Sequence, residues 1–102
     1  MTLNVAVDEE LDALPKDLRA RFLHIAEMLG KFGPFDVSEP YVKPIGDKLF
    51  EMRMKGRSGI ARPIYIAASG QRLVVLHVFV KKTAKAPPRA IRIAQERMKQ
   101  IL

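Results

Sequence analysis

The sequence predicts an α+β domain in which one block of helices precedes one block of strands. Helical spacing dominates the first third of the chain, where apolar residues recur every three or four positions at Leu18, Phe22, Ile25 and Leu29. Apolar runs separated by glycine-containing turns follow between residues 49 and 82. This order predicts one small antiparallel sheet packed against an N-terminal helical hairpin, with a C-terminal helix after it.

The first third of the chain is expected to form a short strand and two helices. The apolar, β-prone run Leu3–Val7 predicts the strand, and Asp8 is placed to cap the helix that follows. Pro15 fits the start of a second helix better than the interior of one continuous helix. Glycines and a proline at positions 30–34 end that helix, and residues 35–47 are expected to be an irregular connector.

Three strands and a final helix are expected in the rest of the chain. In the first strand, one face carries Phe50, Met52 and Met54, and the other carries Glu51, Arg53 and Lys55. In the second, at residues 59–68, Arg62 shares a face with isoleucines, and Pro63 predicts a free edge or a bulge. The third, at residues 72–82, is apolar on both faces and is expected to be central in a sheet covered on one face. The final helix carries Ile91, Ala94, Met98 and Ile101.

Composition places the chain among single globular domains. Its 102 residues are 48% apolar and 28% charged, so we expect one domain with one core, spanning residues 1–102. The absence of cysteine excludes disulfides, thiolate metal ligands and thiol nucleophiles. The N-terminus does not resemble a signal peptide, and no apolar run approaches the ~18 residues of a membrane span. A cytoplasmic location without membrane contact is therefore expected.

Charge is distributed unevenly along the chain. Residues 1–40 hold 4 basic and 8 acidic side chains, a net charge of −4, whereas residues 41–102 hold 14 basic and 3 acidic ones, a net charge of +11. Such a basic half predicts a polyanionic partner, for which nucleic acid is the leading candidate and an anionic membrane a weaker one. Solubility combined with one acidic partner protein is the alternative interpretation.

Alternation in the expected strands allows several basic side chains to project from one sheet. The members expected to converge are Arg53, Lys55, Arg62, Lys81 or Lys82, Tyr65 and His77. Like charges so close repel each other, an arrangement that is poor for stability and suited to binding a phosphate. We therefore expect a concave anion site at the rim of the sheet.

Each member also has an ordinary structural explanation. Arg53 could form a solvated ion pair with Glu51, worth under ~1 kcal/mol. The lysines that end the third strand could instead prevent its pairing with another chain. Tyr65 could be a packed aromatic residue and His77 a core histidine with its hydrogen bonds satisfied, while His24 is expected to be structural or exposed.

Other catalytic chemistries are poorly supported by the sequence. The histidines at positions 24 and 77 are far apart and the carboxylates are scattered, so no metal-ligand spacing is present. The sequence contains no phosphate-binding glycine loop, no dinucleotide fingerprint and no serine nucleophile motif. We therefore expect neither a metal nor a cofactor, and the enzyme mechanism that remains is metal-independent.

At these residues the sequence closely resembles the RelE/HigB-type toxins of bacterial type II toxin-antitoxin systems, in particular their phage-derived HigB-like branch. The matching stretches cover nearly the whole chain and are LDALPKDLRARF, GPF, PYVKPIGDKLFEMRMK, GIARPIYIAASGQRLVVLHVFVKKTAKAPPRAI and IAQERMKQIL. The combination of LFEMR, an arginine three residues before a tyrosine, and LHVFVKKT is fairly specific. The resemblance implies a RelE-like fold and a ribosome-dependent mRNA endonuclease, or mRNA interferase, that inhibits translation.

The resemblance also implies roles for individual positions and partners. The catalytic candidates are Arg53, Arg62, Tyr65, His77, Lys81 and Lys82. The RNA-binding candidates are Lys55, Arg57, Thr83, Lys85 and Arg89. Two positions depart from the usual pattern, since Lys48 stands where members often have glycine and Pro63 where a β-branched or other apolar residue is usual. The implied partners are the ribosome with its mRNA, and a cognate HigA-like antitoxin with a helix-turn-helix domain.

Such an enzyme would use the RNA's own 2′-hydroxyl as nucleophile and would leave a 2′,3′-cyclic phosphate. Arg62, supported by Arg53, is assigned to the charge that develops on the phosphoryl oxygens. The candidates for proton transfer are Lys81, Lys82, Tyr65 and His77. Two alternatives remain open: a ParE-type toxin that inhibits DNA gyrase, and a basic nucleic-acid-binding module without catalysis.

Overall fold

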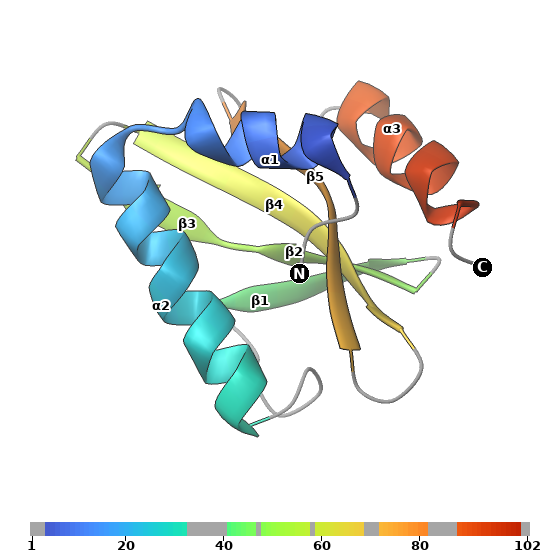
Figure 1. The fold of residues 1–102 in the computed structure, drawn as a ribbon, viewed down its shortest axis with the longest axis horizontal. Coiled ribbons are helices and arrows are strands. Elements are labelled where there is room, and N and C mark those ends of the chain that lie inside the picture. The colour runs from blue at the N-terminus through green and yellow to red at the C-terminus, as the bar shows by residue number, and fades with distance from the viewer. Residues whose placement is uncertain are drawn as a thin grey trace.

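A computed structural model describes residues 4–32, 41–46, 48–57, 59–68, 72–81 and 88–100. In chain order its elements are α1 (Val5–Asp12), α2 (Lys16–Phe32), β1 (Val42–Gly46), β2 (Leu49–Met52), β3 (Met54–Gly56), β4 (Gly59–Ala68), β5 (Arg72–Lys81) and α3 (Pro88–Met98). Figure 1 shows α1 and α2 meeting at a corner, with α3 beside the other end of α1 in this view. The α+β class is confirmed, and the arrangement is compatible with a RelE-like fold.

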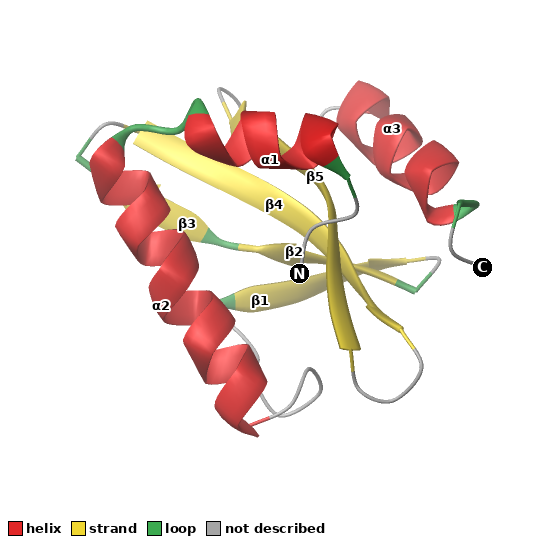
Figure 2. Cartoon of the chain, in the orientation of Figure 1, coloured by secondary structure: helices red, strands yellow, loops and turns green. Residues whose placement is uncertain are grey.

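The strands form one antiparallel sheet with β4 at its centre. β4 pairs with β5 on one side and with both β2 and β3 on the other, and β1 lies outside β2. Glu51 lies opposite Ile64 and Met54 lies opposite Ala61, so β2 and β3 share one register along β4. The two short strands are therefore a single line interrupted at Arg53, where Figure 2 shows a loop segment.

Apolar side chains form two clusters, one on each face of this sheet, where one core was expected. The first packs α1 and α2 against the sheet through residues that include Val7, Leu18, Ile25, Met52, Ala61 and Tyr65. The second packs α3 against the sheet through Leu49, Ile64, Ile66, Val74, Leu76, Ala90 and Ala94. Ile64, Tyr65 and Ile66 alternate between the clusters because successive strand residues point to opposite faces. The expectation of a sheet covered on one face is therefore wrong.

The position expected for the third strand, β5, is also wrong. Within the described ranges β5 pairs with β4 alone, so it is an edge strand. Its apolar residues on both faces are explained by the two clusters, to which Val75 and Val74 contribute respectively. A strand that is apolar on both faces indicates that both faces of the sheet are covered. It does not show whether the strand is at the edge or in the centre of the sheet.

The N-terminal strand expected at Leu3–Val7 is wrong as well, because Val5 to Val7 belong to α1. Asn4, and not Asp8, caps this helix: its side-chain oxygen accepts a hydrogen bond from the Val7 backbone N–H at 3.2 Å. Burial of Val7 in the first cluster then selects the helix over an isolated strand. Two helices nevertheless form on either side of Pro15, as expected, and meet at a corner; the Pro15 carbonyl accepts the first hydrogen bonds of α2.

β1 lies inside the segment expected to be an irregular connector. Its Pro44 is tolerated because β1 is at the edge of the sheet, where a missing N–H breaks no ladder. In the turn to β2, Gly46 and Lys48 have φ angles of 95° and 69°. Lys48 therefore has the left-handed backbone that favours glycine.

Pro63 lies in the central strand, and the ladder is interrupted opposite it, as its lack of an N–H predicts. The backbone N–H of Arg53 points away from β4 and donates to the Tyr41 carbonyl at 2.7 Å. Because hydrogen-bonding directions alternate along a strand, Met52 directs its carbonyl toward β4, at the level of Pro63. Pro63 has no N–H to offer that carbonyl, so β2 ends there.

Tyr65 is a core residue. It is 0% exposed in the first cluster, and its ring stacks on Phe50 with the centroids 5.6 Å apart. The buried Tyr65 hydroxyl has no hydrogen-bond partner among the described residues, and burial raises the pKa of this phenol above its ordinary value. A buried hydroxyl without a partner costs stability, so the ring and not the oxygen stabilises the fold.

We expect Tyr65→Phe to leave the free energy of unfolding unchanged or to raise it by up to ~1 kcal/mol, because the variant keeps the stacked ring and removes the unpaired oxygen. Tyr65→Ala is the matched comparison and should cost about 3 to 5 kcal/mol through the cavity it leaves. Urea unfolding of the three proteins measures both changes. A loss of more than ~1 kcal/mol in Tyr65→Phe would contradict the absence of a partner for the hydroxyl.

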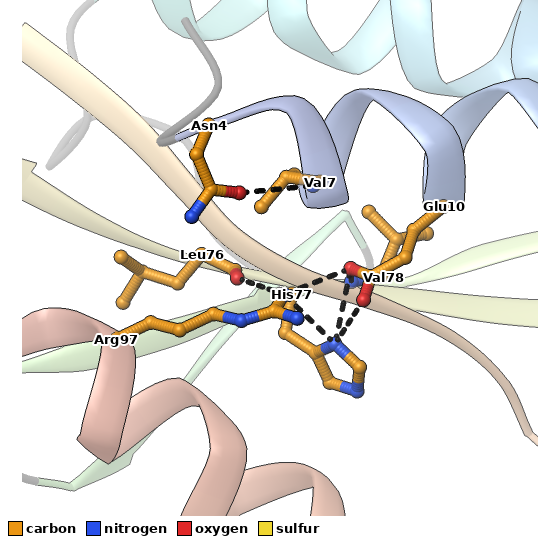
Figure 3. A network of polar contacts seen from close by, with 7 residues as sticks. All are labelled: Asn4, Val7, Glu10, Leu76, His77, Val78 and Arg97. Carbon is orange, nitrogen blue, oxygen red and sulfur yellow. Dashed lines mark hydrogen bonds and ion pairs between the residues drawn. The ribbon is translucent and has the colours of Figure 1, made fainter.

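A polar cluster of Glu10, His77 and Arg97 joins α1, β5 and α3 at the edge of the sheet (Figure 3). β5 contains a bulge there, since Ile64 lies opposite His77 but Tyr65 lies opposite Val75. The Val78 N–H donates to Glu10 Oε1 at 3.0 Å, and Arg97 Nη1 donates to the Leu76 carbonyl at 2.8 Å and to Glu10 Oε1 at 3.1 Å. Side chains thus satisfy backbone groups that an edge strand would otherwise offer to another chain.

Hydrogen bonding fixes the protonation of this cluster. His77 Nδ1 lies 3.1 Å from both carboxylate oxygens of Glu10, which only accept, so Nδ1 carries a proton. The 3.4 Å approach of Arg97 to the same nitrogen is therefore not a hydrogen bond. Burial lowers the pKa of His77 below its ordinary value, against the opposing charge of Glu10. Burial alone would raise the pKa of Glu10, but hydrogen bonds from Arg97 and Val78 and the nearby positive charges leave it lowered.

Acid is expected to weaken the fold through this cluster. The pKa of His77 is lower in the folded chain, so the unfolded chain binds more protons and stability falls as the pH drops below about 6.5. The lowered pKa of Glu10 adds a further loss below about 4.5. Urea unfolding between pH 7.5 and 5 measures the first loss, and His77→Gln, which cannot titrate, should flatten it. Equal pH dependence in both proteins would contradict this account.

Candidate functional site

A basic cleft of about 950 Å³ lies along the outer edge of β3, between that strand and α2. Tyr41 pairs with Arg53 beside the start of β1, and within the described residues β1 pairs with β2 and not with β3. The residues that line it are Arg21, His24, Ile25, Tyr41, Arg53, Met54, Lys55, Gly56, Arg57 and Arg62. Five of these ten are arginine or lysine and none is acidic, so the cleft attracts anions.

Arg53 and Arg62 lie opposite each other on neighbouring strands. The shared register of β2 and β3 against β4 places Arg53 beside Arg62, between the pairs Glu51–Ile64 and Met54–Ala61. The N–H direction of Arg53 makes this a non-hydrogen-bonded pair, in which opposite side chains are closest. Two like charges facing each other destabilise a sheet. An anion bound between them would remove that repulsion.

Arg62 is held by the neighbouring strand. It is 7% exposed, and its Nε lies 3.6 Å from Oε1 of Glu51, which is 4% exposed. Burial lowers the pKa of the Arg62 guanidinium, the charge of Glu51 opposes this change, and the charge of Arg53 adds to it. Glu51, which was considered as the partner of Arg53 in a solvated ion pair, is itself buried and forms an ion pair with Arg62. Loss of either partner would leave an uncompensated buried charge.

α2 forms the second wall of the cleft, which the sequence did not predict. Arg21 and His24 are exposed on this helix and line the cleft; the expected exposure of His24 is confirmed, and its place in the cleft was not predicted. They are three residues apart and so lie on one face, directly beside the buried stripe that contains Ile25. The sequence shows that both residues lie next to the apolar stripe of α2. It does not show that this stripe packs beside β3, which is what places them in the cleft.

The structure brings together only some of the candidates from the sequence. The strand residues Arg53 and Arg62 line the cleft with Lys55 and Arg57. Tyr65 lies in the first cluster on the opposite face of β4 from Arg62, and His77 belongs to the edge cluster with Glu10. The expected convergence of Tyr65 and His77 with the arginines is therefore wrong, because strand alternation separates the tyrosine and α1 holds the histidine.

The remaining candidates lie elsewhere or outside the described residues. Arg89 is exposed at the start of α3 and does not line the cleft. Lys81 is the last residue of β5 and pairs with Ile60 through its backbone, which is the part of it that the structure describes. Lys82, Thr83 and Lys85 lie outside the described residues. Their predicted roles stay predictions.

Within the described ranges, no group of three or more histidine, aspartate or glutamate side chains is placed to hold a metal ion. None of the helices described combines the length and the apolar character that crossing a membrane requires.

Comparison with known proteins places the chain in a family. A family model described as "Phage derived protein Gp49-like (DUF891)" matches residues 9–99, which contain the cleft, the paired arginines and the edge cluster. A search of curated proteins finds no significant match. The match spans far more than half of the chain, and the fold agrees with the RelE-like arrangement that the sequence resemblance implies. The chain belongs to the Gp49-like family of phage-derived proteins, a RelE-like and toxin-like family.

Proposed function

We propose that this protein is the toxin of a type II toxin-antitoxin system and acts as a metal-independent, ribosome-dependent mRNA endonuclease of the HigB type. The observation that carries the proposal is the pair Arg53 and Arg62, which face each other on neighbouring strands in a cleft without acidic lining. A toxin-like family and a strongly basic C-terminal part of the chain support it.

The chemistry requires little beyond positioning and charge. RNA supplies the attacking 2′-oxygen, the phosphorus–O5′ bond breaks, and the products are a 2′,3′-cyclic phosphate and a 5′-hydroxyl. Negative charge grows on the phosphoryl oxygens, which forked guanidinium groups match in two places. Arg53 and Arg62, which both line the cleft, would bind those oxygens. Lys55 and Arg57 would neutralise flanking phosphates.

Two protons must move in this reaction, one from the 2′-hydroxyl and one to the 5′-oxygen. Histidine is the commonest side chain for such transfers, and His24 is the histidine whose side chain lines the cleft. His77 is instead engaged by the Glu10 carboxylate. We assign one of the two transfers to His24, and the lysines at the end of β5 stay candidates for the other.

A basic site of this kind must be silenced in the cell that makes it. The proposal therefore includes a cognate antitoxin that covers the cleft with an acidic segment. The ribosome would supply ordered mRNA, because a cleft this open fixes a flexible strand poorly by itself.

We expect Arg53→Ala to lower cleavage of translated mRNA by about 100- to 1,000-fold, because it removes a charged donor from the reacting phosphate. Arg62→Lys is more informative than Arg62→Ala, because it keeps the positive charge beside Glu51 while removing the guanidinium fork. Arg92→Ala is the matched control, since Arg92 is exposed on α3 and does not line the cleft.

Primer extension on mRNA, with and without translating ribosomes, measures these changes, and thermal unfolding shows whether each variant folds. Ribosome-dependent cuts that fall in the two cleft variants and persist in Arg92→Ala would support the proposal. If the folded wild-type protein makes no cuts under any condition, the endonuclease assignment is wrong. Inhibition of DNA gyrase then becomes the activity to measure.

We expect His24→Gln to lower cleavage by about 100- to 10,000-fold, the usual contribution of a general acid or base. His77→Gln, measured in parallel, decides between the two histidines. A larger loss of cleavage in His77→Gln than in His24→Gln, at equal stability, would transfer the role to His77.

A further inference from the structure

The basic cleft continues into a second cavity along α2. This cavity has a volume of about 520 Å³ and is lined by Pro15, Lys16, Asp17, Arg21, Gly56 and Arg57. Arg21, Gly56 and Arg57 also line the first cleft, so the two cavities meet at these residues. Together they form a groove that runs from Tyr41, past the paired arginines, to the start of α2.

Positive charge extends along the whole groove. Seven of its lining side chains are basic, namely Lys16, Arg21, His24, Arg53, Lys55, Arg57 and Arg62, and Asp17 is its acidic lining residue. Arg21 comes from α2 and Arg57 from the turn just after β3, and both are exposed and line both cavities. Guanidinium groups from two separate elements can therefore approach one anion from two sides.

Gly56 allows α2 to come this close to β3. A Cβ atom at Gly56 would lie 2.5 Å from Oδ2 of Asp17 and 3.2 Å from a methyl carbon of the buried Leu18. A side chain here would displace the Asp17 carboxylate and press against Leu18 in the first turn of α2. The close approach brings Arg21 to the edge of β3, and so the junction of the two cavities depends on the first turn of α2.

We infer that this junction is a second phosphate subsite, in which Arg21 and Arg57 bind the phosphate next to the one held at Arg53 and Arg62. The inference rests on the proposed function, because it takes the occupant of the first cleft to be a single-stranded RNA. Such a strand presents phosphates at regular intervals, and two adjoining basic cavities match that repeat better than one isolated anion. The first turn of α2, with Lys16, then guides the strand out of the groove.

Counting released counterions tests this subsite directly. The probe is a short single-stranded RNA with 2′-O-methyl groups, which cannot be cleaved, and its affinity is measured by fluorescence anisotropy at several salt concentrations. For single strands the slope of log affinity against log salt changes by ~0.7 for each phosphate contact. We expect Arg21→Ala to make the slope shallower by ~0.7 and to weaken binding several-fold.

Two comparisons make the result specific. Arg92→Ala removes the same charge from the exposed surface of α3 and should leave the slope unchanged. A dinucleotide carries one phosphate, which the inference places at Arg53 and Arg62, so Arg21→Ala should weaken its binding less than it weakens binding of the longer RNA. Equal slopes for Arg21→Ala and the wild type on the longer RNA would overturn the inference. So would an Arg21→Ala effect seen with polyglutamate and absent with RNA, which would make the groove a site for an acidic peptide.

The two proposals can fail separately. Ribosome-dependent cleavage by the wild type, together with unchanged slopes in Arg21→Ala, would keep the endonuclease and remove the subsite. A changed slope in a protein that cuts no RNA would keep the phosphate contact and remove the endonuclease.

Discussion

The placement of a proline in the central strand is the constraint on which the rest of the structure depends. β4 is hydrogen-bonded on both sides and buried on both faces, yet Pro63 cannot donate to the line formed by β2 and β3. The ladder therefore stops at Arg53, whose N–H pairs with Tyr41 instead. Two apolar clusters keep β4 in place despite the lost bond, and the interruption lies where the two arginines meet.

The site combines features that a structure selected for stability alone would avoid. Arg53 faces a second arginine, and Arg62 and Glu51 are charges removed from water. Local features that conflict with stability tend to mark functional positions. The apolar clusters on either side of the sheet offset this loss of stability. The two arginines are thereby held in place before an anion binds, so binding does not require them to rearrange.

Much of the fold could be predicted from periodicity, and the exceptions have physical causes. The apolar stripe of α2 and the alternating faces of β2, β3 and β4 follow from local spacing alone. β1 forms a hairpin with the adjacent β2 although Pro44 and Gly46 are typical of a connector, and the edge position of β5 depends on which other strands pair with β4, which local spacing does not report. In the site, Arg53 and Arg62 were predicted because they share one sheet face. Arg21 and His24 were missed because their role depends on how α2 packs beside β3.

The edge cluster also has a consequence for how the chain folds. Glu10 is separated from His77 by 67 positions and from Arg97 by 87, so its contacts close long loops. Closing such loops is unfavourable until the hairpins of the sheet already exist. We therefore expect the cluster to form late in folding, after the transition state. Interactions that form after the transition state slow unfolding more than they speed folding. We therefore expect the edge cluster to contribute chiefly kinetic stability.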